Sequence, residues 1–342
     1  MKKNILLICG SLNQTTMMHK ISNYLQDYHC YFTPYYAEGF LAFLTRLGLT
    51  NFCILGGKHR KATEEYLAKH QLPIDFGGRS RKYDLVITCS DLIVQRNIRK
   101  SRIVLVQEGM TEPEGLMFKL VKWFKLPRWL ANTSTTGLSY AYDLFCVASP
   151  GYRDLFVKKG VKREKILVTG IPNFDHAATY LRNDFPEKDY VLVATSCNRE
   201  NFKWDNRMDF LKKAVQIAGD RPIIFKLHPN EIEELARWEI NQVAPGAKVI
   251  SRGDIGPMIA NCQTLITQTT SAVYIGVALG KEIYSYFDKK QLERLMPIQN
   301  GGTSAQKIAS ACRHLIHTPR YQLKSVARKL RKRLGWQTTN SN

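Results

Sequence analysis

Short apolar runs alternate with longer amphipathic stretches along most of the chain. In the first half the predicted strands are Ile5–Cys9, Phe52–Leu55, Asp84–Thr88, Ile103–Val106 and Leu144–Ala148. In the second half they are Tyr190–Ala194, Pro222–Leu227, Lys248–Ile250, Thr264–Thr267 and Ile283–Tyr286. Short apolar strands with helices between them indicate parallel sheets that are covered on both faces. The pattern therefore predicts an α/β protein.

The strands fall into two sets that separate near residues 171–175. A chain of 342 residues is long enough for two domains. We predict a Rossmann-like domain over 1–170, a second Rossmann-like domain over 171–316, and a basic helix and tail over 317–342. In doubly wound sheets ligands bind at the carboxyl ends of the strands. The residues that directly follow each strand are therefore the candidates for function.

Hydropathy and cysteine usage predict a cytoplasmic protein. No apolar run approaches the roughly 20 residues that cross a bilayer, and the run Ile5–Ile8 is too short for a signal peptide. The eight cysteines form no C-x-x-C pair, so neither a disulfide framework nor a metal site is expected. The net charge of +21 favours an anionic partner such as a nucleotide, an acidic polymer, nucleic acid or an anionic membrane.

Two segments combine basic and apolar residues at helical spacing. Leu116–Leu130 mixes lysines with Trp123, Phe124 and Trp129, and Arg320–Arg333 carries seven basic residues and no acidic one. Such segments suit the interface of an anionic leaflet, although packing of each helix on its own domain is the alternative. We expect membrane contact from Leu116–Leu130 first, and less strongly from Arg320–Arg333, with the protein peripheral on the inner face of the membrane.

In the first domain the candidate residues follow two strands. Gln107-Glu108-Gly109 comes after Ile103–Val106, where Glu108 is placed to deprotonate an acceptor hydroxyl as general base and Gly109 leaves room for the substrate. Gly10-Ser11 ends the first strand and begins a turn into a helix.

In the second domain polar residues follow three predicted strands. His228-Pro229 comes after Pro222–Leu227, with Lys226 two residues before His228, and His228 is placed to donate a hydrogen bond to a phosphate. Hydroxyl side chains before the predicted helix Ala272–Leu279 predict a phosphate site as well as a helix cap. Arg199 either pairs with phosphate or forms a structural pair with Glu200 or Asp205. The remaining nucleotide-binding candidates are Thr195, Asn198, Thr269, Thr270 and Ser271.

Several common motifs are missing. The sequence has no G-x-G-x-x-G, no Walker A motif and no G-x-S-x-G, so a dinucleotide-dependent oxidoreductase, a P-loop NTPase and an α/β-hydrolase are poorly supported. It also has no Asp-x-Asp motif. We expect neither a cofactor nor a metal.

The order of the strand-end segments resembles the superfamily of GT-B glycosyltransferases and non-hydrolysing UDP-N-acetylglucosamine 2-epimerases. Residues 84–87 leading to Asp91 are similar to the epimerase strand that ends in an aspartate, and residues 166–175 are similar to the segment that enters the second domain. Arg199-Glu200-Asn201-Phe202, His228-Pro229-Asn230, Leu279-Gly280-Lys281 and Gly301-Gly302-Thr303 follow in the expected order. The resemblance covers roughly residues 84–308. It implies two Rossmann-like domains that face each other across a cleft. Residues 1–170 would form the acceptor-side domain, with Gly10, Ser11, Asp91 and Gly109 on the acceptor side, and residues 171–316 would bind the nucleotide-sugar.

The reactive positions of the epimerases differ in this chain. Cys197-Asn198 stands where that family has a histidine, residues 132–137 replace an acidic segment, and residues 268–271 replace an Asp-Ser-Gly-Gly loop. The changed loops resemble those of bacterial sialyltransferases, Kdo capsule transferases and CDP-glycerol glycerophosphotransferases. That resemblance implies that Glu108 acts as the base and that His228, Pro229, Thr270 and Ser271 hold the nucleotide phosphate. Gln107 stands where those families often have an acidic residue.

Together these observations predict a metal-independent glycosyltransferase. It would move a sugar from a nucleotide-activated donor to a glycan or lipid-linked acceptor in surface polysaccharide synthesis. The alternatives are an epimerase-like enzyme that acts on a UDP-sugar, and a catalytically inactive nucleotide-sugar-binding scaffold. Nucleic-acid binding is not expected, because the basic residues accompany no recognisable nucleic-acid-binding module.

Overall fold

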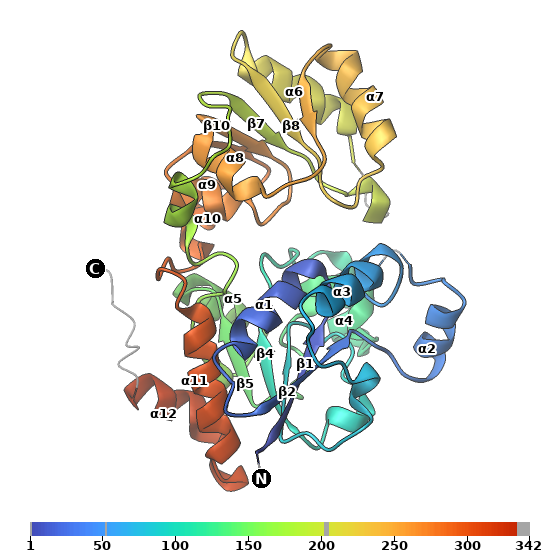
Figure 1. Ribbon diagram of the computed structural model, residues 1–342, viewed down its shortest axis with the longest axis vertical. Helices are drawn as coiled ribbons and strands as arrows, with labels where there is room; N and C mark the ends of the chain where they lie inside the picture. Colours follow the sequence, from blue (N-terminus) through green and yellow to red (C-terminus); the bar gives the residue numbers. More distant parts are fainter. Residues whose placement is uncertain (1, 52, 202–204, 334–342) are drawn as a thin grey trace. The chain divides into compact units, whose positions relative to one another are not determined.

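The computed structural model describes residues 2–51, 53–201 and 205–333. The chain divides into two compact units, of which the first comprises residues 1–175 and 302–342 and the second comprises residues 176–301. Each unit contains one all-parallel sheet with helices packed on it (Figure 1). The predicted α/β class and the two Rossmann-like sheets are confirmed.

The sheet of the first unit has six strands in the order β2-β1-β3-β4-β5-β6. The strands are β1 (Asn4–Cys9), β2 (His29–Pro34), β3 (Leu85–Thr88), β4 (Arg102–Val106), β5 (Leu144–Val147) and β6 (Ile166–Val168). The α-helices are α1 (Leu12–Ser22), α2 (Gly39–Arg46), α3 (Gly57–Lys69), α4 (Leu116–Phe124), α5 (Pro150–Lys159), α11 (Ser304–His317) and α12 (Val326–Arg333). Short 3₁₀ segments include η3 (Arg128–Thr135), η4 (Arg163–Lys165) and η7 (Arg320–Ser325).

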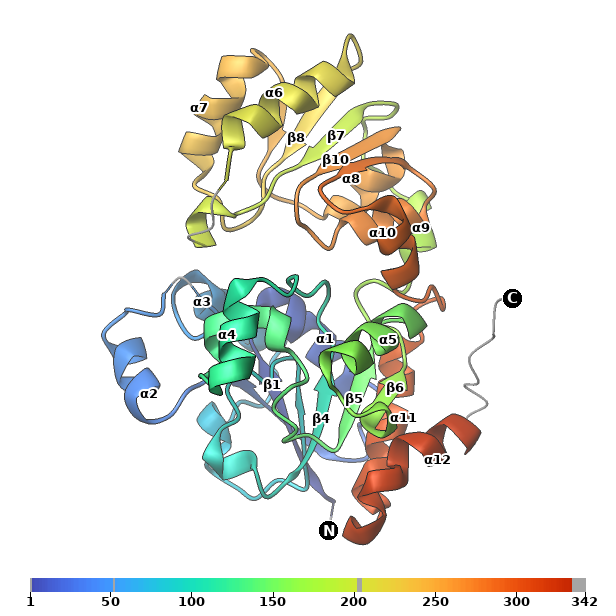
Figure 2. The same ribbon diagram turned by 180° about the vertical axis from the view of Figure 1, so that it is seen from behind.

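The sheet of the second unit has five strands in the order β11-β10-β7-β8-β9. The strands are β7 (Val191–Ala194), β8 (Ile223–Lys226), β9 (Lys248–Ile250), β10 (Thr264–Thr267) and β11 (Glu282–Ser285). The α-helices are α6 (Arg207–Ala218), α7 (Glu233–Val243), α8 (Ile255–Asn261), α9 (Val273–Ala278) and α10 (Lys289–Leu295), and Figure 2 shows the same elements from behind. The core between β7, β8, α6 and α7 includes Val193, Phe210, Leu211, Phe225 and Ile240.

Burial explains which strands the sequence predicted well. All four residues of β3, β5, β7 and β10 are buried, so these strands are nearly continuous apolar runs. Strand β2 lies at an edge of its sheet and begins with exposed and half-buried residues. Its sequence HCYFTP therefore lacks a long apolar run, and the pattern did not predict this strand. Residues 53–55 of the strand predicted at Phe52–Leu55 form a turn instead, and Phe52 lies outside the described residues.

The chain returns to the first unit at Gly302, earlier than the sequence-based boundary at residue 316. Helix α11 buries Ile308, Cys312 and Leu315 and packs against α1 and β4 of the first unit. The chain leaves the first unit after Asp175 and returns to it at Gly302. These two points are linked, because the buried Asp175 carboxylate accepts a hydrogen bond from the backbone N–H of Ser304 (2.9 Å). Helix α11 belongs to the first unit because its apolar face packs against α1 and β4.

The basic C-terminal helix α12 has a covered apolar face. Its side chains Val326, Ala327 and Leu330 are buried, and the helix packs against η4, η7 and β6. A helix whose apolar residues are already buried on its own unit has no such face to insert into a bilayer. The structure therefore favours the packed alternative for Arg320–Arg333.

Candidate functional site

The candidate nucleotide-binding residues of the second unit lie at the carboxyl ends of three neighbouring strands. Strand β7 lies between β10 and β8, with Ala194 beside Thr267 and Lys226 in the sheet register. The loops that follow these strands contain Thr195–Asn198, Gln268–Ser271 and His228–Glu231. The parallel topology thus brings three segments that are far apart in sequence to one edge of the sheet.

Side-chain contacts join these three loops. The backbone N–H of Thr269 donates to the Ser196 hydroxyl (3.4 Å), and the Thr269 hydroxyl donates to the Asn198 side-chain oxygen (3.3 Å). On the other side of the β7 loop, the Cys197 sulfur lies 3.8 Å from Nε2 of His228. The loop after β7 is therefore connected to both neighbours and forms the centre of a polar rim.

Local hydrogen bonds orient the imidazole of His228. The backbone N–H of Asn230 donates to Nδ1 of His228 (3.2 Å), so this nitrogen is an acceptor. In a neutral imidazole the other nitrogen, Nε2, then carries the proton. The half-buried side chain consequently presents a donor at the sheet edge. Pro229 follows directly and fixes the backbone of the turn.

A buried ionic network lies beneath the His228 loop. The Glu231 carboxylate accepts hydrogen bonds from the backbone N–H of His228 (2.6 Å) and from the Thr195 hydroxyl. It also pairs with Arg207 (2.7 Å), whose guanidinium lies 3.6 Å from Glu239. Burial raises the pKa of Glu231, and the Arg207 charge opposes that rise. Thr195 and Glu231 therefore support the loop from below.

Arg199 belongs to the same network. Its guanidinium pairs with Glu239 (2.6 Å) and with Glu200 (3.1 Å). The sequence left open a phosphate contact or a structural pair with Glu200 or Asp205. The structure contains the Glu200 pair, with Glu239 as the second partner. Asp205 instead accepts a hydrogen bond from the Gln268 side chain (2.8 Å).

Lys226 lies beneath the rim. Its side chain is buried, and its ammonium donates to the backbone carbonyls of Ser251 (3.0 Å) and Leu227 (3.2 Å). Burial lowers the pKa of this lysine, and the Glu231 charge partly offsets the effect. In this arrangement Lys226 holds the end of β8 to the chain that follows β9.

The hydroxyl loop before α9 differs from the predicted helix cap. Ala272 is the N-cap residue, and no side chain caps the helix from that position. The Thr270 hydroxyl accepts a hydrogen bond from the Ala272 N–H at 3.4 Å. Helix α9 is only six residues long, so its dipole adds little to an anion site. Thr270 is held by its bond to Ala272 within its own loop, whereas Thr269 is held by Ser196 and Asn198 of the loop after β7.

In the first unit Glu108 reaches from the end of β4 to the start of α1. Its carboxylate accepts hydrogen bonds from the side chains of Ser11 (2.7 Å), Asn13 (3.3 Å) and Gln14 (2.5 Å). Ser11 is also the N-cap of α1, because its hydroxyl accepts from the backbone N–H of Gln14. Three donors thus orient one half-buried carboxylate at the carboxyl edge of the sheet.

The partners of Glu108 were not predictable from the sequence pattern. Gln14 fits beside Gly10, where a Cβ atom would lie 2.1 Å from the Gln14 side-chain oxygen. His59 of α3 lies close enough to Glu108 for that charge to raise its pKa, although burial has the larger effect and lowers it. Gln14 and His59 are distant from Glu108 in sequence, so only the fold identifies them.

The two neighbours of Glu108 have structural contacts. The Gln107 side chain donates to the Gly109 carbonyl (2.8 Å) and accepts from the Ala148 N–H (2.9 Å), which links the ends of β4 and β5. Gln107 is buried, so it does not replace an exposed acidic residue.

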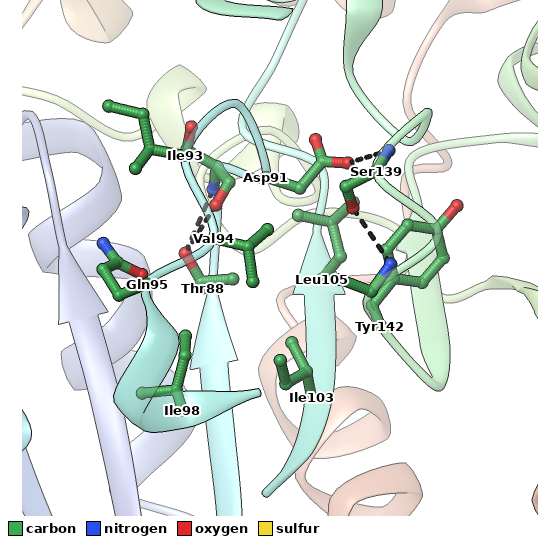
Figure 3. Close-up of a pocket in the computed structure, with 12 residues that line it drawn as sticks. Thr88, Asp91, Ile93, Val94, Gln95, Ile98, Ile103, Leu105, Ser139 and Tyr142 are labelled. Carbon is green, nitrogen blue, oxygen red and sulfur yellow. Dashed lines mark hydrogen bonds between the residues drawn. The ribbon is translucent and has the colours of Figure 1, made fainter. Parts of the chain in front are cut away.

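Asp91 holds a loop rather than an open site. Its buried carboxylate accepts from the backbone N–H groups of Gly137 (3.0 Å) and Ser139 (3.0 Å). Figure 3 shows Asp91 directed toward Ser139 at the side of a small cavity. The cavity measures about 10 Å³, which is room for one water molecule and far too little for a sugar. Asp91 is therefore a structural residue in this arrangement.

Two features concern metals and membranes. Among the described residues, no three His, Cys, Asp or Glu side chains gather as a metal site would require. In the part of the chain that the structure describes, no helix combines the length and apolarity needed to cross a bilayer.

Comparison with solved structures identifies the fold. A Listeria monocytogenes protein assigned as a UDP-N-acetylglucosamine 2-epimerase is 12% identical and superposes with a TM-score of 0.56, covering 94% of this chain and 98% of that one. S. aureus MnaA in a complex with UDP is 14% identical, with a TM-score of 0.53 and coverage of 95% and 91%. The Neisseria meningitidis UDP-GlcNAc 2-epimerase bound to UDP-GlcNAc is 12% identical, with a TM-score of 0.51 and coverage of 95% and 94%. The chain shares the fold of these three proteins.

Sequence comparison alone gives no relative. No protein-family model matches the chain, and no curated protein matches it. The fold is thus similar to that of solved 2-epimerases over nearly the whole chain, at 12% sequence identity.

Proposed function

We propose that this protein is a glycosyltransferase of the GT-B type that uses a nucleotide-activated sugar. The observation that carries the proposal is the carboxylate of Glu108, which three side-chain donors orient at the carboxyl edge of the first sheet. A fixed carboxylate at that edge suits a general base acting on an acceptor hydroxyl. The acceptor is a glycan or a lipid-linked saccharide in surface polysaccharide synthesis.

In this proposal the second unit binds the nucleotide of the donor. The rim formed by Asn198, His228 and Thr269 holds an amide, an imidazole N–H and a hydroxyl at one sheet edge, where a phosphate would replace the contact of Thr269 with Asn198 and that of His228 with Cys197. Such donors suit the phosphate oxygens of a nucleotide. Loops at the carboxyl ends of parallel strands are the usual ligand site of this architecture. Thr195 and Lys226 act from beneath by holding the loops, and Arg199 has its charge matched by two carboxylates.

The proposed reaction is a direct displacement at the anomeric carbon. Glu108 takes the proton of the acceptor hydroxyl, whose oxygen forms the new bond to that carbon. The bond from the anomeric carbon to the phosphate oxygen of the donor breaks, and the nucleotide leaves with both electrons of that bond. A hydrogen bond from Nε2 of His228 stabilises the negative charge that develops on the leaving phosphate.

An epimerase that acts on a UDP-sugar is the second candidate. The likeness to solved 2-epimerases favours it. Against it, Cys197-Asn198 and Gln268–Ser271 stand where the epimerase family has reactive groups, as noted from the sequence. The nucleotide that the protein prefers distinguishes the two. Preferential binding of a cytidine nucleotide supports transfer from a CMP- or CDP-linked donor, and preferential binding of UDP supports the epimerase.

Nucleotide release tests the enzyme directly. The protein is incubated with candidate CMP-, CDP- and UDP-linked donors, with and without lipid-linked acceptors, and free nucleotide is measured. We expect release that depends on the acceptor and disappears in Glu108→Gln. A sugar product altered only in configuration, with no nucleotide released, would instead establish the epimerase. No turnover, together with nucleotide binding, would point to the scaffold.

The proposal includes a membrane as the location of the acceptor. The segment Leu116–Leu130 mixes basic and aromatic residues, which suits an anionic leaflet. A protein bound there would work on the cytoplasmic face, where nucleotide-activated donors are available.

A further inference from the structure

Helix α2 and the turn after it expose apolar side chains on the first unit. None of the residues of α2 is buried. Phe40 is 72% exposed and Phe43 is 55% exposed, and Leu47 and Leu49 in the following turn are exposed as well. Figures 1 and 2 both show α2 at the periphery of its unit, apart from the helices that pack on the sheet. Its exposed residues are therefore available to a partner.

A second exposed apolar surface lies on α4 and the start of η3. Only Phe118 and Val121 of α4 are buried, where they pack with Ala131. Trp123 is 82% exposed and Phe124 is 65% exposed. The remaining exposed apolar side chains of this segment are Leu116, Met117, Leu126, Trp129 and Leu130.

The two exposed segments are attached to the same loop. Glu38, the N-cap residue of α2, accepts a hydrogen bond from the backbone N–H of Arg96 (2.7 Å). Arg128, the first residue of η3, donates to the backbone carbonyl of Asp91 (3.0 Å). Asp91 and Arg96 are five positions apart in the loop after β3, so at most about 18 Å of chain separates the two attachment points. Both segments therefore start from the same region of the first unit.

The charge of the two segments is of one sign. Residues 39–51 and 116–130 together contain Arg46, Lys119, Lys122, Lys125 and Arg128, and they contain no aspartate or glutamate. Lysine and arginine near aromatic and aliphatic side chains suit the headgroup region of an anionic bilayer, where the rings lie among the lipids and the charges meet phosphate. Attraction to lipid phosphate accounts for the excess of basic residues, whereas docking of another protein would not by itself require it.

We propose that α2 with its turn (residues 39–49) and the α4–η3 segment (residues 116–130) form one two-part surface that binds an anionic phospholipid leaflet. The new element is α2, whose apolar residues carry no basic cluster of their own and would insert beside the charged α4–η3 segment. This inference deepens the proposed function by naming where the acceptor is met. It does not depend on the donor, because vesicle binding is measured without nucleotide.

Vesicle flotation of the full chain tests the surface. The probes are vesicles of phosphatidylcholine alone and of phosphatidylcholine mixed with phosphatidylglycerol. We expect binding to the mixed vesicles, weakened about tenfold in Phe40→Ser/Phe43→Ser and in Trp123→Ser/Phe124→Ser, because each pair removes two inserted rings. Lys119→Gln and Lys122→Gln should each weaken binding about fivefold. The control is Leu235→Ser/Trp238→Ser, which removes exposed apolar residues from α7 of the second unit and should bind like the wild type.

Four outcomes would overturn the proposal. The first is no binding to mixed vesicles. The second is equal binding to both vesicle types. The third is a self-associating protein that becomes monomeric in the ring variants, which would make this surface an interface between two copies. The fourth is unchanged vesicle binding by Phe40→Ser/Phe43→Ser, which would remove α2 from the surface. The melting transition of each variant confirms that it folds. The shift in melting temperature caused by nucleotide, measured on the same variants, tests the donor site. A failure of membrane binding is thereby distinguished from a failure of the proposed function.

Discussion

The Glu108 carboxylate accepts a hydrogen bond from the Ser11 hydroxyl, 2.7 Å away, although 97 positions separate the two residues. The bond joins the end of β4 to the N-cap of α1 across the intervening strand β3. Ser11 at the same time accepts from the Gln14 N–H, so one hydroxyl fixes both the helix start and the carboxylate. This arrangement is the basis for the role assigned to Glu108.

Replacing Glu108 by Gln should abolish transfer while leaving nucleotide binding intact. A positioned general base contributes about 10²–10⁴-fold to the rate, and an amide cannot take the proton. The measurement is nucleotide release from the donor that the wild type uses, alongside the melting-temperature shift caused by the free nucleotide. Turnover within a few-fold of the wild type would show that Glu108 only braces the start of α1.

Replacing Asp91 by Asn should destabilise the first unit without a specific effect on chemistry. The buried carboxylate accepts from two backbone N–H groups with separate oxygens, and an amide retains only one acceptor. The expected loss is about 1–3 kcal/mol in the free energy of unfolding. Denaturant titration measures it. The matched control is Asp27→Asn, which removes an exposed pair with Arg313 and should cost under about 1 kcal/mol. Similar losses in both variants would contradict the assignment.

Replacing Arg207 by Met should loosen the His228 loop. The change leaves the buried carboxylates of Glu231 and Glu239 without this guanidinium, which costs about 3–5 kcal/mol. Hydrogen exchange should quicken in peptides that cover residues 191–195 and 223–231, and nucleotide binding should weaken. Arg237→Met is the control, because it breaks an exposed pair with Glu233 on α7 and should cost about 0.5 kcal/mol or less. Unchanged exchange in the loop would show that the network does not support it.

The first unit should lose stability as the pH falls below about 6.5. Burial, assisted by the nearby His70, lowers the pKa of His19 in the folded protein. The unfolded chain then binds the proton at a higher pH than the folded one, so the contribution of His19 is complete above its unfolded pKa of about 6.5 and is lost as the pH falls through the lower folded pKa. Burial lowers the pKa of His59 in the same direction, partly offset by Glu108.

Denaturant titrations of the wild type and of His19→Gln check this pH dependence. The variant should lose less stability between about pH 7.5 and 5.5 than the wild type, because glutamine does not titrate. Parallel curves for the two proteins would show that His19 contributes nothing to the pH dependence.

Central strands were predictable because both of their faces are covered. Central strand β10 has the predicted bounds, and β1, β3, β4, β7 and β8 differ from the predicted bounds by one residue at one or both ends. Edge strand β9 also has the predicted bounds, although none of its residues is buried. Edge strand β2 was not predicted, because half of its residues are exposed or partly buried. Helix α11 was assigned to the second domain, because the spacing of apolar residues in an amphipathic helix does not show which unit the helix packs against.

The candidate site was predictable only as far as strand ends allow. Parallel topology places His228, Thr269 and Glu108 at the carboxyl edges of their sheets, and the sequence predicts that much. It could not show that the Lys226 ammonium turns to the Ser251 carbonyl, or that Gln14 reaches Glu108, because these contacts join residues 25 and 94 positions apart. The aromatic residues of Leu116–Leu130 favoured that segment over Arg320–Arg333 for membrane contact, but the pattern could not show that the apolar face of α12 is covered and that of α4 is exposed.

The most direct test of the account is the melting temperature in the presence of CMP, CDP, UDP and GDP at matched concentration. A ligand that binds only the folded state stabilises it by RT ln(1 + L/Kd), where L is the free ligand concentration. We predict a rise with one class of pyrimidine nucleotide, preserved in Glu108→Gln and in the exposed-histidine control His29→Ala, and strongly reduced in His228→Ala. No rise with any nucleotide, or a rise that His228→Ala leaves unchanged, would contradict a nucleotide site at the ends of β7, β8 and β10.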